Sequence, residues 1–196
     1  LGISFDMRAQ YTEGLAMFEP AMAALKAHPR SPDRDVALAY LALWSSIMTG
    51  YYRQRERSAA FLIMGVELLD DSSSLTDVLA LRDFARGYFD LLLDDPVEAR
   101  MHFQSGFERY LSLGSVWDAS HCLLNWGSAF YYRTDNHTTD FAHGKEKVEQ
   151  ALTLVESTGD MYMRAHVLTS LGQLAAAHRR FDAAKEYYQR AQDLHR

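Results

Sequence analysis

The chain has 196 residues, of which 48% are hydrophobic and only four are proline, so it can form one domain with a sizeable core. Its formal net charge of -6 argues against general nucleic-acid binding, which needs a basic footprint, and leaves room for a local basic patch. No apolar run approaches the roughly 18 residues that span a membrane, and no signal peptide is visible. The single cysteine, Cys122, excludes an internal disulfide and fits a reducing compartment, so we expect a cytoplasmic protein.

The first stretch, residues 1–28, contains an amphipathic helix that ends near Ala27. One face of this helix carries apolar or small residues at helical spacing: Tyr11, Gly14, Phe18 and Ala21. Pro20 predicts a kink, because proline inside a helix removes a hydrogen bond and clashes with the preceding turn. A proline-containing linker follows at residues 28–32.

A helix pair is predicted over residues 33–70. Asp33 or Asp35 can cap its first helix, and the polar segment 53–57 forms the turn. Ser45 is the small residue of the first helix. The return helix carries its own stripe at a 3–4 period: Ala59, Ile63 and Val66.

A similar pair is predicted over residues 75–113. The separations from Ser45 to Ala85 (85 − 45) and from Ala59 to Ala99 (99 − 59) are both 40 residues. This double agreement indicates a repeated unit. A proline, which is tolerated in a first turn, starts the return helix at position 96.

The fourth pair, over residues 116–157, has the longest turn. Its first helix contains an apolar stripe: Leu123, Trp126, Gly127 and Phe130. The polar turn at residues 134–140 separates Gly127 from Gly144 by 17 residues (144 − 127), which marks an insertion. Val148 and Ala151 continue the return helix.

The fifth pair, over residues 160–196, is the clearest. One face of its first helix carries Leu168, Leu171, Gly172 and Ala175. After the polar break at residues 178–180, a second stripe follows: Phe181, Ala184, Tyr188, Ala191 and Leu194. The small residues Gly172 and Ala184 let the two helices approach closely, while Tyr188 fills the space beside them. Arg179 stands where a turn glycine is common, which predicts a looser turn.

This last pair resembles the tetratricopeptide repeat, whose signature is W-x2-L-G-x2-Y followed by A-x3-F. The matching positions are Leu168, Leu171, Gly172, Ala175, Ala184 and Tyr188. The anchors of the five copies, separated by 43, 40, 42 and 45 residues against 34 in the standard repeat, are Gly2, Ser45, Ala85, Gly127 and Gly172. The resemblance implies one all-α domain, a right-handed α-solenoid of about five antiparallel helix pairs. The pairs cover approximately residues 1–28, 33–70, 75–113, 116–157 and 160–196.

Long, irregular repeats of this style resemble the helical-repeat regions of MalT-type bacterial transcriptional regulators, related signal-transducing ATPases and some nucleotide cyclases. The chain begins at Leu1 rather than Met, and residues 1–5 read as the end of an incomplete helix. We therefore expect a fragment of a larger protein. No P-loop, G-x-S-x-G or H-E-x-x-H motif occurs, so a nucleotide site of the parent would lie outside this chain.

The sequence favours no catalytic or metal site. His121 and Cys122 are adjacent, and helical neighbours point about 100° apart, so the two cannot act together locally. His137 and His143 lie in or beside the long turn, where a solvated loop is favoured over a zinc site. We predict no enzyme activity, no metal and no cofactor.

The resemblance places binding in the concave groove of stacked repeats, which first helices line. Carried over by register, the predicted groove residues are Asp6 from the first pair; Ala42, Ser46 and Thr49 from the second; Arg82, Arg86 and Phe89 from the third; His121, Leu124, Ser128, Tyr131 and Tyr132 from the fourth; and His166, Thr169 and Gln173 from the fifth. Arg82 and Arg86 share a helix face and could hold a carboxylate or phosphate; alternatively, Arg86 pairs with Asp83 or Asp90 on a solvated face. The tyrosines could stack on a ligand or pack under the next pair, and the histidines could be groove groups or partly buried.

The leading hypothesis is a non-catalytic interaction or effector-sensing module of a multidomain bacterial regulator. It would bind a protein, a peptide or a small effector, and neither nucleic acid nor a membrane. The alternative is a structural spacer or self-association array, including the C-terminal repeat region of a nucleotide cyclase. Chaperone-tail binding is disfavoured, because Asn125 alone resembles the lysine and asparagine cluster of that subfamily.

Overall fold

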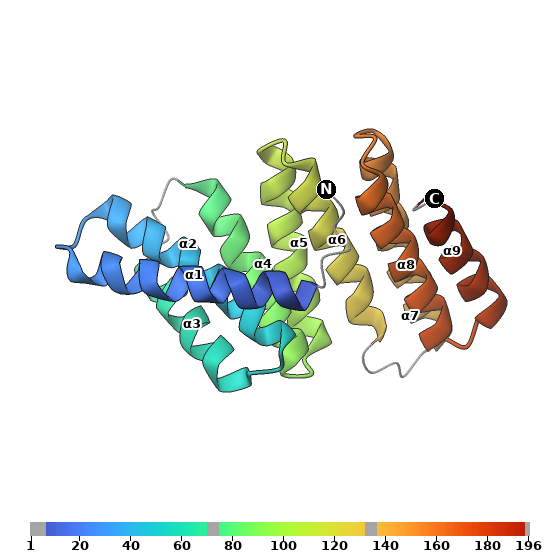
Figure 1. Ribbon diagram of the computed structural model, residues 1–196. Coiled ribbons are helices and arrows are strands. Elements are labelled where there is room, and N and C mark those ends of the chain that lie inside the picture. Colours follow the sequence, from blue (N-terminus) through green and yellow to red (C-terminus); the bar gives the residue numbers. More distant parts are fainter. Residues whose placement is uncertain (1–6, 70–74, 132–136, 195–196) are drawn as a thin grey trace. The chain divides into compact units, whose positions relative to one another are not determined.

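The computed structural model describes residues 7–69, 75–131 and 137–194, and all regular structure within these ranges is helical (Figure 1). The predicted all-α class is therefore confirmed, and no helix in the described ranges is long and apolar enough to cross a membrane. In chain order the elements are α1 (Met7–Ala27), α2 (Pro32–Tyr51), α3 (Arg55–Leu68), α4 (Thr76–Leu92), α5 (Pro96–Ser112), α6 (Val116–Ser128), the 3-10 turn η1 (Ala129–Tyr131), α7 (His137–Glu156), α8 (Met161–Ala177) and α9 (Phe181–Asp193).

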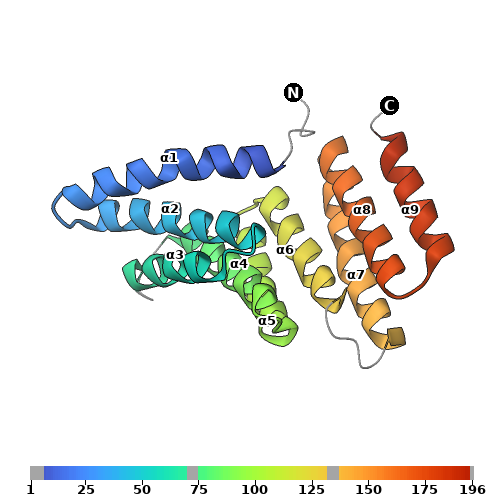
Figure 2. The same cartoon turned by 60° about the horizontal axis from the view of Figure 1, so that its bottom comes forward.

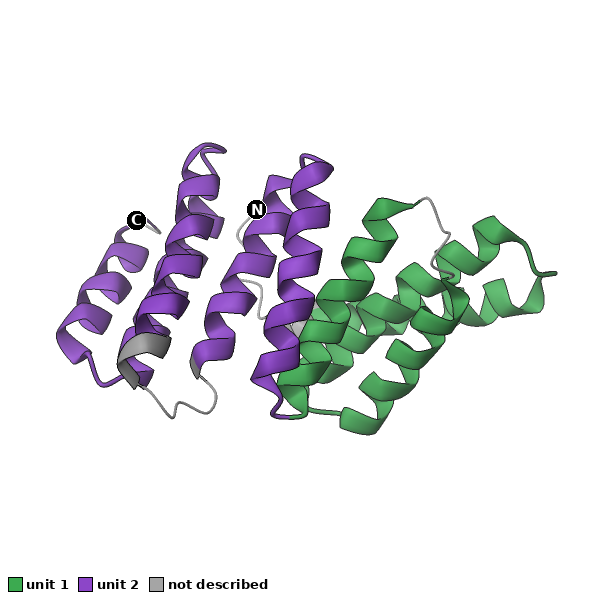
Figure 3. Ribbon diagram, turned by 180° about the vertical axis from the view of Figure 1, so that it is seen from behind, with its two compact units in different colours: residues 1–93 green, residues 94–196 purple. Residues whose placement is uncertain are grey.

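The chain divides into two compact units, residues 1–93 and 94–196, which Figure 3 colours separately. Each unit is described by itself. The two helices of the predicted third pair, α4 and α5, belong to different units. A single domain and a continuous five-pair solenoid therefore remain predictions, and the expected helix end at residues 1–5 lies outside the described residues.

In unit 1, α2 contacts α1, α3 and α4, and α3 also contacts α4. Figure 2 shows α1 and α2 side by side and antiparallel. They are joined by a buried cluster of Met22, Leu38 and Ala42, against which part of α3 packs. The helix α1 continues through Pro20 without interruption.

The cap of α2 differs from the prediction. Ser31, rather than Asp33 or Asp35, is the N-cap, and its Oγ accepts a hydrogen bond from the Arg34 amide at 3.3 Å. Proline at the next position has a φ angle already suited to the first helical turn, which favours Ser31 as the cap. Asp35 instead pairs with Arg34 at 2.6 Å.

The contact between α2 and α3 is shifted by one residue from the predicted register. Ser46 and Ser58 meet, each 1% exposed, and each hydroxyl donates to the other residue's carbonyl oxygen at 2.9 Å. Ile63, predicted to lie in the contact, is 56% exposed. Ser45, the predicted small residue of α2, is fully buried, whereas Ala59 of the predicted α3 stripe is only half-buried. The close contact between α2 and α3 is thus made by two serines, Ser46 and Ser58, whose buried hydroxyls are satisfied by hydrogen bonds to backbone carbonyl oxygens.

In unit 2, each of the helices α5 to α8 contacts the next helix in the chain, and α6 also contacts α8. Figure 1 shows α8 and α9 side by side. A β-carbon on Gly172 would lie 2.6 Å from the Tyr188 ring, and one on Gly127 would lie 2.8 Å from the carbonyl oxygen of Gly144. The predicted close approaches in the fourth and fifth pairs are confirmed. Phe181, predicted to join the packing stripe, is 68% exposed instead.

The turn between α8 and α9 is as tight as a glycine-containing turn. Arg179 has φ +59°, and the Arg180 amide donates to the carbonyl oxygen of Ala175 at 2.8 Å. The looser turn predicted from Arg179 was therefore wrong. Residues with positive φ occur in five interhelical turns of the described chain: Arg53, Asp94, Gly114, Gly159 and Arg179.

Replacing Gly159 with alanine is expected to lower the free energy of unfolding by about 1 kcal/mol. Gly159 has φ +71°, and a β-carbon there would meet no atom within 4 Å, so the loss comes from backbone conformation alone. Urea unfolding followed by circular dichroism measures it. The Gly159→Asn variant should lose less, because asparagine tolerates the left-handed region. Equal losses for the two variants would contradict this account.

Candidate interaction surface on α6 and α8

The predicted arginine pair on α4 is not an open anion clamp. Arg82 is 9% exposed, and its Nε lies 3.4 Å from Oδ1 of Asp83, which is 5% exposed. Arg86 and Phe89, on the same helix, are half-buried. The carboxylate of Asp83 therefore already faces one of the two guanidinium groups.

Two predicted residues from different helices come together in unit 2. His121 lies on α6 and His166 on α8, with 5.7 Å between their ring centroids. The indole ring of Trp117, one turn before His121, is 4.0 Å from the imidazole. The ring planes are tilted by 42° in the first contact and 59° in the second, and Trp117 is 48% exposed, so this ring cluster reaches the solvent.

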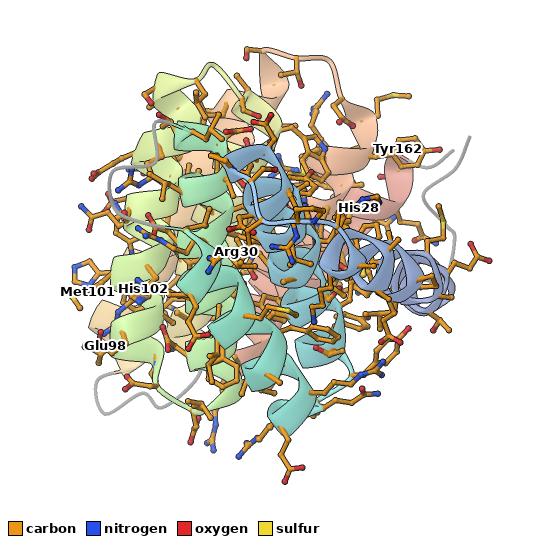
Figure 4. All side chains as sticks on the ribbon, turned by 90° about the vertical axis from the view of Figure 1, so that its left-hand side faces the viewer. His28, Arg30, Glu98, Met101, His102 and Tyr162 are labelled. Carbon is orange, nitrogen blue, oxygen red and sulfur yellow. The ribbon has the colours of Figure 1, made fainter. Side chains whose placement is uncertain are left out.

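An aromatic residue also precedes His166 by one turn. Tyr162 is 38% exposed, and Figure 4 shows its ring directed away from the helices. Gln173, two turns after His166, is also exposed. We call these five residues the α6–α8 surface: Trp117, His121, Tyr162, His166 and Gln173.

The remaining predicted groove residues add little to the α6–α8 surface. On α2, Ala42, Ser46 and Thr49 are buried, so their assignment to the groove was wrong. Asp6 lies outside the described residues. Leu124 is 2% exposed and belongs to the hydrophobic core of unit 2, so its assignment to the groove was wrong. Thr169 uses its hydroxyl to donate to the Ala165 carbonyl oxygen at 2.8 Å. Tyr131 closes η1, but its side chain and all of Tyr132 lie outside the described residues.

Trp117 and Tyr162 were missed by the sequence prediction. The groove positions were carried over from the repeat register, which selects residues beside the packing stripe. Positions one turn earlier on the same helix face were not considered. Both residues lie four positions before a predicted histidine, at a spacing that puts side chains on one helix face. An aromatic residue at that spacing was the signal that could have identified them.

The hydrogen bond of His121 fixes its neutral tautomer. Nδ1 lies 3.2 Å from the Trp117 carbonyl oxygen, which can only accept, so Nδ1 carries the proton and Nε2 is an acceptor. Burial, aided by the nearby His166, lowers the pKa of His121 to about 4. Burial also lowers the pKa of His166, although the residue as a whole is exposed.

At neutral pH the α6–α8 surface is therefore uncharged at both imidazoles. It offers aromatic ring faces and one acceptor nitrogen on each imidazole. Across the described ranges, no three His, Cys, Asp or Glu side chains gather into a group that could hold a metal ion. Aromatic ring faces and hydrogen-bond acceptors are therefore what this surface presents.

Comparison with protein-family models and with curated proteins finds no match. Among solved structures, the chain is similar to BtubC (BKLC) from P. vanneervenii, with a TM-score of 0.68 and 15% sequence identity. The similarity covers 95% of this chain and 73% of that chain. At this identity the likeness shows a shared helical fold alone.

Proposed function

We propose that this chain is a non-catalytic binding module that recognises a peptide segment or small effector through the α6–α8 surface. The observation that carries the proposal is the cluster of three tilted rings from Trp117, His121 and His166, with centroid distances of 4.0 and 5.7 Å and an exposed indole at one end. Exposed aromatic side chains gathered on one surface are typical of binding hot spots. Tyr162 extends the surface along α8.

The helix packing within unit 2 supports a tetratricopeptide-like module. In unit 2, Gly172 lies under Tyr188 and Gly127 packs against Gly144, as the close helix packing of that repeat requires. The α6–α8 surface lies on helices that the resemblance identifies as first helices, whose exposed faces line the groove in stacked repeats. The proposal places the module in a multidomain bacterial regulator, following the repeat style.

The chemistry of the α6–α8 surface limits which chemical groups the ligand should carry. The indole of Trp117 offers a face for an aromatic or aliphatic group. Nε2 of neutral His121 accepts a hydrogen bond, so the ligand should carry a donor close to its apolar group. A peptide segment with an aromatic side chain and a free backbone amide satisfies both requirements.

The proposal predicts that replacing Trp117 with alanine weakens ligand binding at least about tenfold, as expected for a central aromatic anchor. Peptides selected from a displayed random library would be titrated into both proteins by isothermal calorimetry. Tyr40→Ala, which removes a 44% exposed aromatic ring from α2 in unit 1, is the control and should leave affinity unchanged. Selected peptides that bind the Trp117→Ala variant and the unmodified protein equally would refute the proposal.

A further inference from the structure

Unit 2 also contains a hollow away from the α6–α8 surface, with a volume of about 580 Å³. Its walls come from the first half of α7, the α8–α9 turn and the start of α9. Its lining residues are Phe141, Lys145, Arg179, Arg180, Phe181, Asp182, Ala183 and Tyr187. We call it the α7–α9 cleft, and its volume lies within the range of small-molecule sites.

The charge of the α7–α9 cleft is opposite to that of the whole chain. Three cationic side chains face one carboxylate, that of Asp182, whereas the chain carries a net charge of -6. Lys145 lies 3.2 Å from the carboxylate of Glu149. Arg179 and Arg180 form no ion pair with the residues that the structure describes. Two guanidinium groups therefore remain for an anion.

Aromatic rings lie beside these guanidinium groups. The guanidinium carbon of Arg180 is 4.2 Å from the ring centroid of Phe141. An arginine stacked in this way keeps the N–H groups in its plane for hydrogen bonds to a carboxylate or phosphate. Phe181 is 68% exposed and Tyr187 is half-buried, so both have ring surface to offer. The lining thus fits a ligand that is both aromatic and anionic.

The surroundings of the cleft limit the size of that ligand. A neighbouring hollow of about 520 Å³ shares Phe141 and Lys145 with it and continues along α7. The carboxylates of Glu146 and Glu149 line this neighbouring hollow. A polyanion extending along α7 would meet them and be repelled. A small anion confined to the cleft avoids them.

We propose that the α7–α9 cleft binds a small aryl carboxylate or aryl phosphate, with the anionic group on Arg179 and Arg180 and the ring against Phe181 and Tyr187. This site shares no residue with the α6–α8 surface. It therefore adds a small-molecule ligand to the proposed function and can fail or succeed independently of it.

Phenyl phosphate is the probe, titrated into the full chain by calorimetry and by amide chemical shifts. We expect saturable binding at least about tenfold tighter than that of inorganic phosphate or phenol, because each of these keeps only half of the recognised group. Shifts should concentrate at residues 179–183 and at Phe141. Arg180→Gln should weaken binding at least about fivefold. Lys185→Gln removes the same charge from α9 outside the cleft and should change the affinity less than about twofold.

Phe181→Ala is the second test variant, because its ring is exposed and its loss should leave the fold intact. It should weaken phenyl phosphate and leave inorganic phosphate unchanged. No saturation by about 10 mM phenyl phosphate, which corresponds to negligible affinity, would overturn the proposal. So would equal losses for Arg180→Gln and Lys185→Gln, which would indicate general attraction to positive charge. A phosphotyrosine tripeptide binding more tightly than phenyl phosphate would overturn the assignment to a free small molecule.

Discussion

Replacing Gly127 with alanine is expected to lower the free energy of unfolding of unit 2 by about 3 kcal/mol. The new β-carbon would lie 2.4 Å from Cγ2 of Val148 and 2.8 Å from the carbonyl oxygen of Gly144. Val148 is fully buried, and a β-branched side chain in a helix has essentially one rotamer, so it cannot turn away. The other contact is with backbone. Helices α6 and α7 would have to separate, and the gain in helix propensity of about 1 kcal/mol offsets only part of that cost.

Urea unfolding of Gly127→Ala, Gly172→Ala and the unmodified chain measures the effect. Gly172→Ala is the matched control, because its β-carbon would meet the ring of Tyr188, which is 41% exposed and can move outward. Its loss should be smaller. Adding Val148→Ala to Gly127→Ala should restore part of the stability, because it removes one of the two clashes. A Gly127→Ala variant as stable as the unmodified chain would contradict this account of the α6–α7 contact.

The same contact shows what a sequence pattern can predict. Gly127 and Gly144 stand out because no other residue type permits so close an approach, so their roles follow from the spacing alone. In α2 and α3 the candidates were adjacent small residues, Ser45 beside Ser46 in α2 and Ser58 beside Ala59 in α3. Composition could not separate them. Reciprocal hydrogen bonds between Ser46 and Ser58 decided the register, and such bonds depend on geometry that a repeat pattern does not contain.

Sequence reasoning anticipated part of the candidate sites. It selected His121 and His166, because helical register alone puts them on exposed faces of neighbouring first helices. It did not identify Arg82 as buried, since burial depends on how the neighbouring side chains pack. The residues of the α7–α9 cleft come from α7, from the α8–α9 turn and from α9, and no sequence period relates them to one another. Its residues are brought together only by tertiary structure.

Lowering the pH from 6.5 to about 4 is expected to destabilise unit 2 through His121. The pKa of His121 is lowered from an ordinary value of 6.5 to about 4 in the folded chain. Between these values the unfolded chain binds more protons, so the folded state loses stability as the pH falls, and above 6.5 the contribution is complete. The full shift corresponds to roughly 3 kcal/mol at about 1.4 kcal/mol per pKa unit. Because the ring is only half-buried and partly screened by solvent, we expect about 2 kcal/mol.

The groups around His121 set the size of this effect. His166, whose pKa is also lowered by burial, faces it from α8 and should add to the loss in the same range of pH. Asp160, the N-cap of α8, acts in the opposite direction, because its carboxylate raises the pKa of His121. Asp160→Asn should therefore steepen the loss of stability on acidification, since asparagine keeps the cap and removes the charge.

His121→Phe tests the assignment, because it removes the titrating group and keeps a ring between Trp117 and His166. Thermal unfolding between pH 7 and pH 4 should show a shallower loss of stability for this variant than for the unmodified chain. His28→Gln, at an exposed histidine of unit 1 seen in Figure 4, is the control and should leave the pH dependence unchanged. Carboxylates that titrate near pH 4 contribute to all three proteins and cancel in the comparison. An identical pH dependence for His121→Phe and the unmodified chain would exclude His121 as the source. Protonation would also turn its Nε2 from an acceptor into a donor, so a ligand held by the α6–α8 surface should be released over the same range of pH.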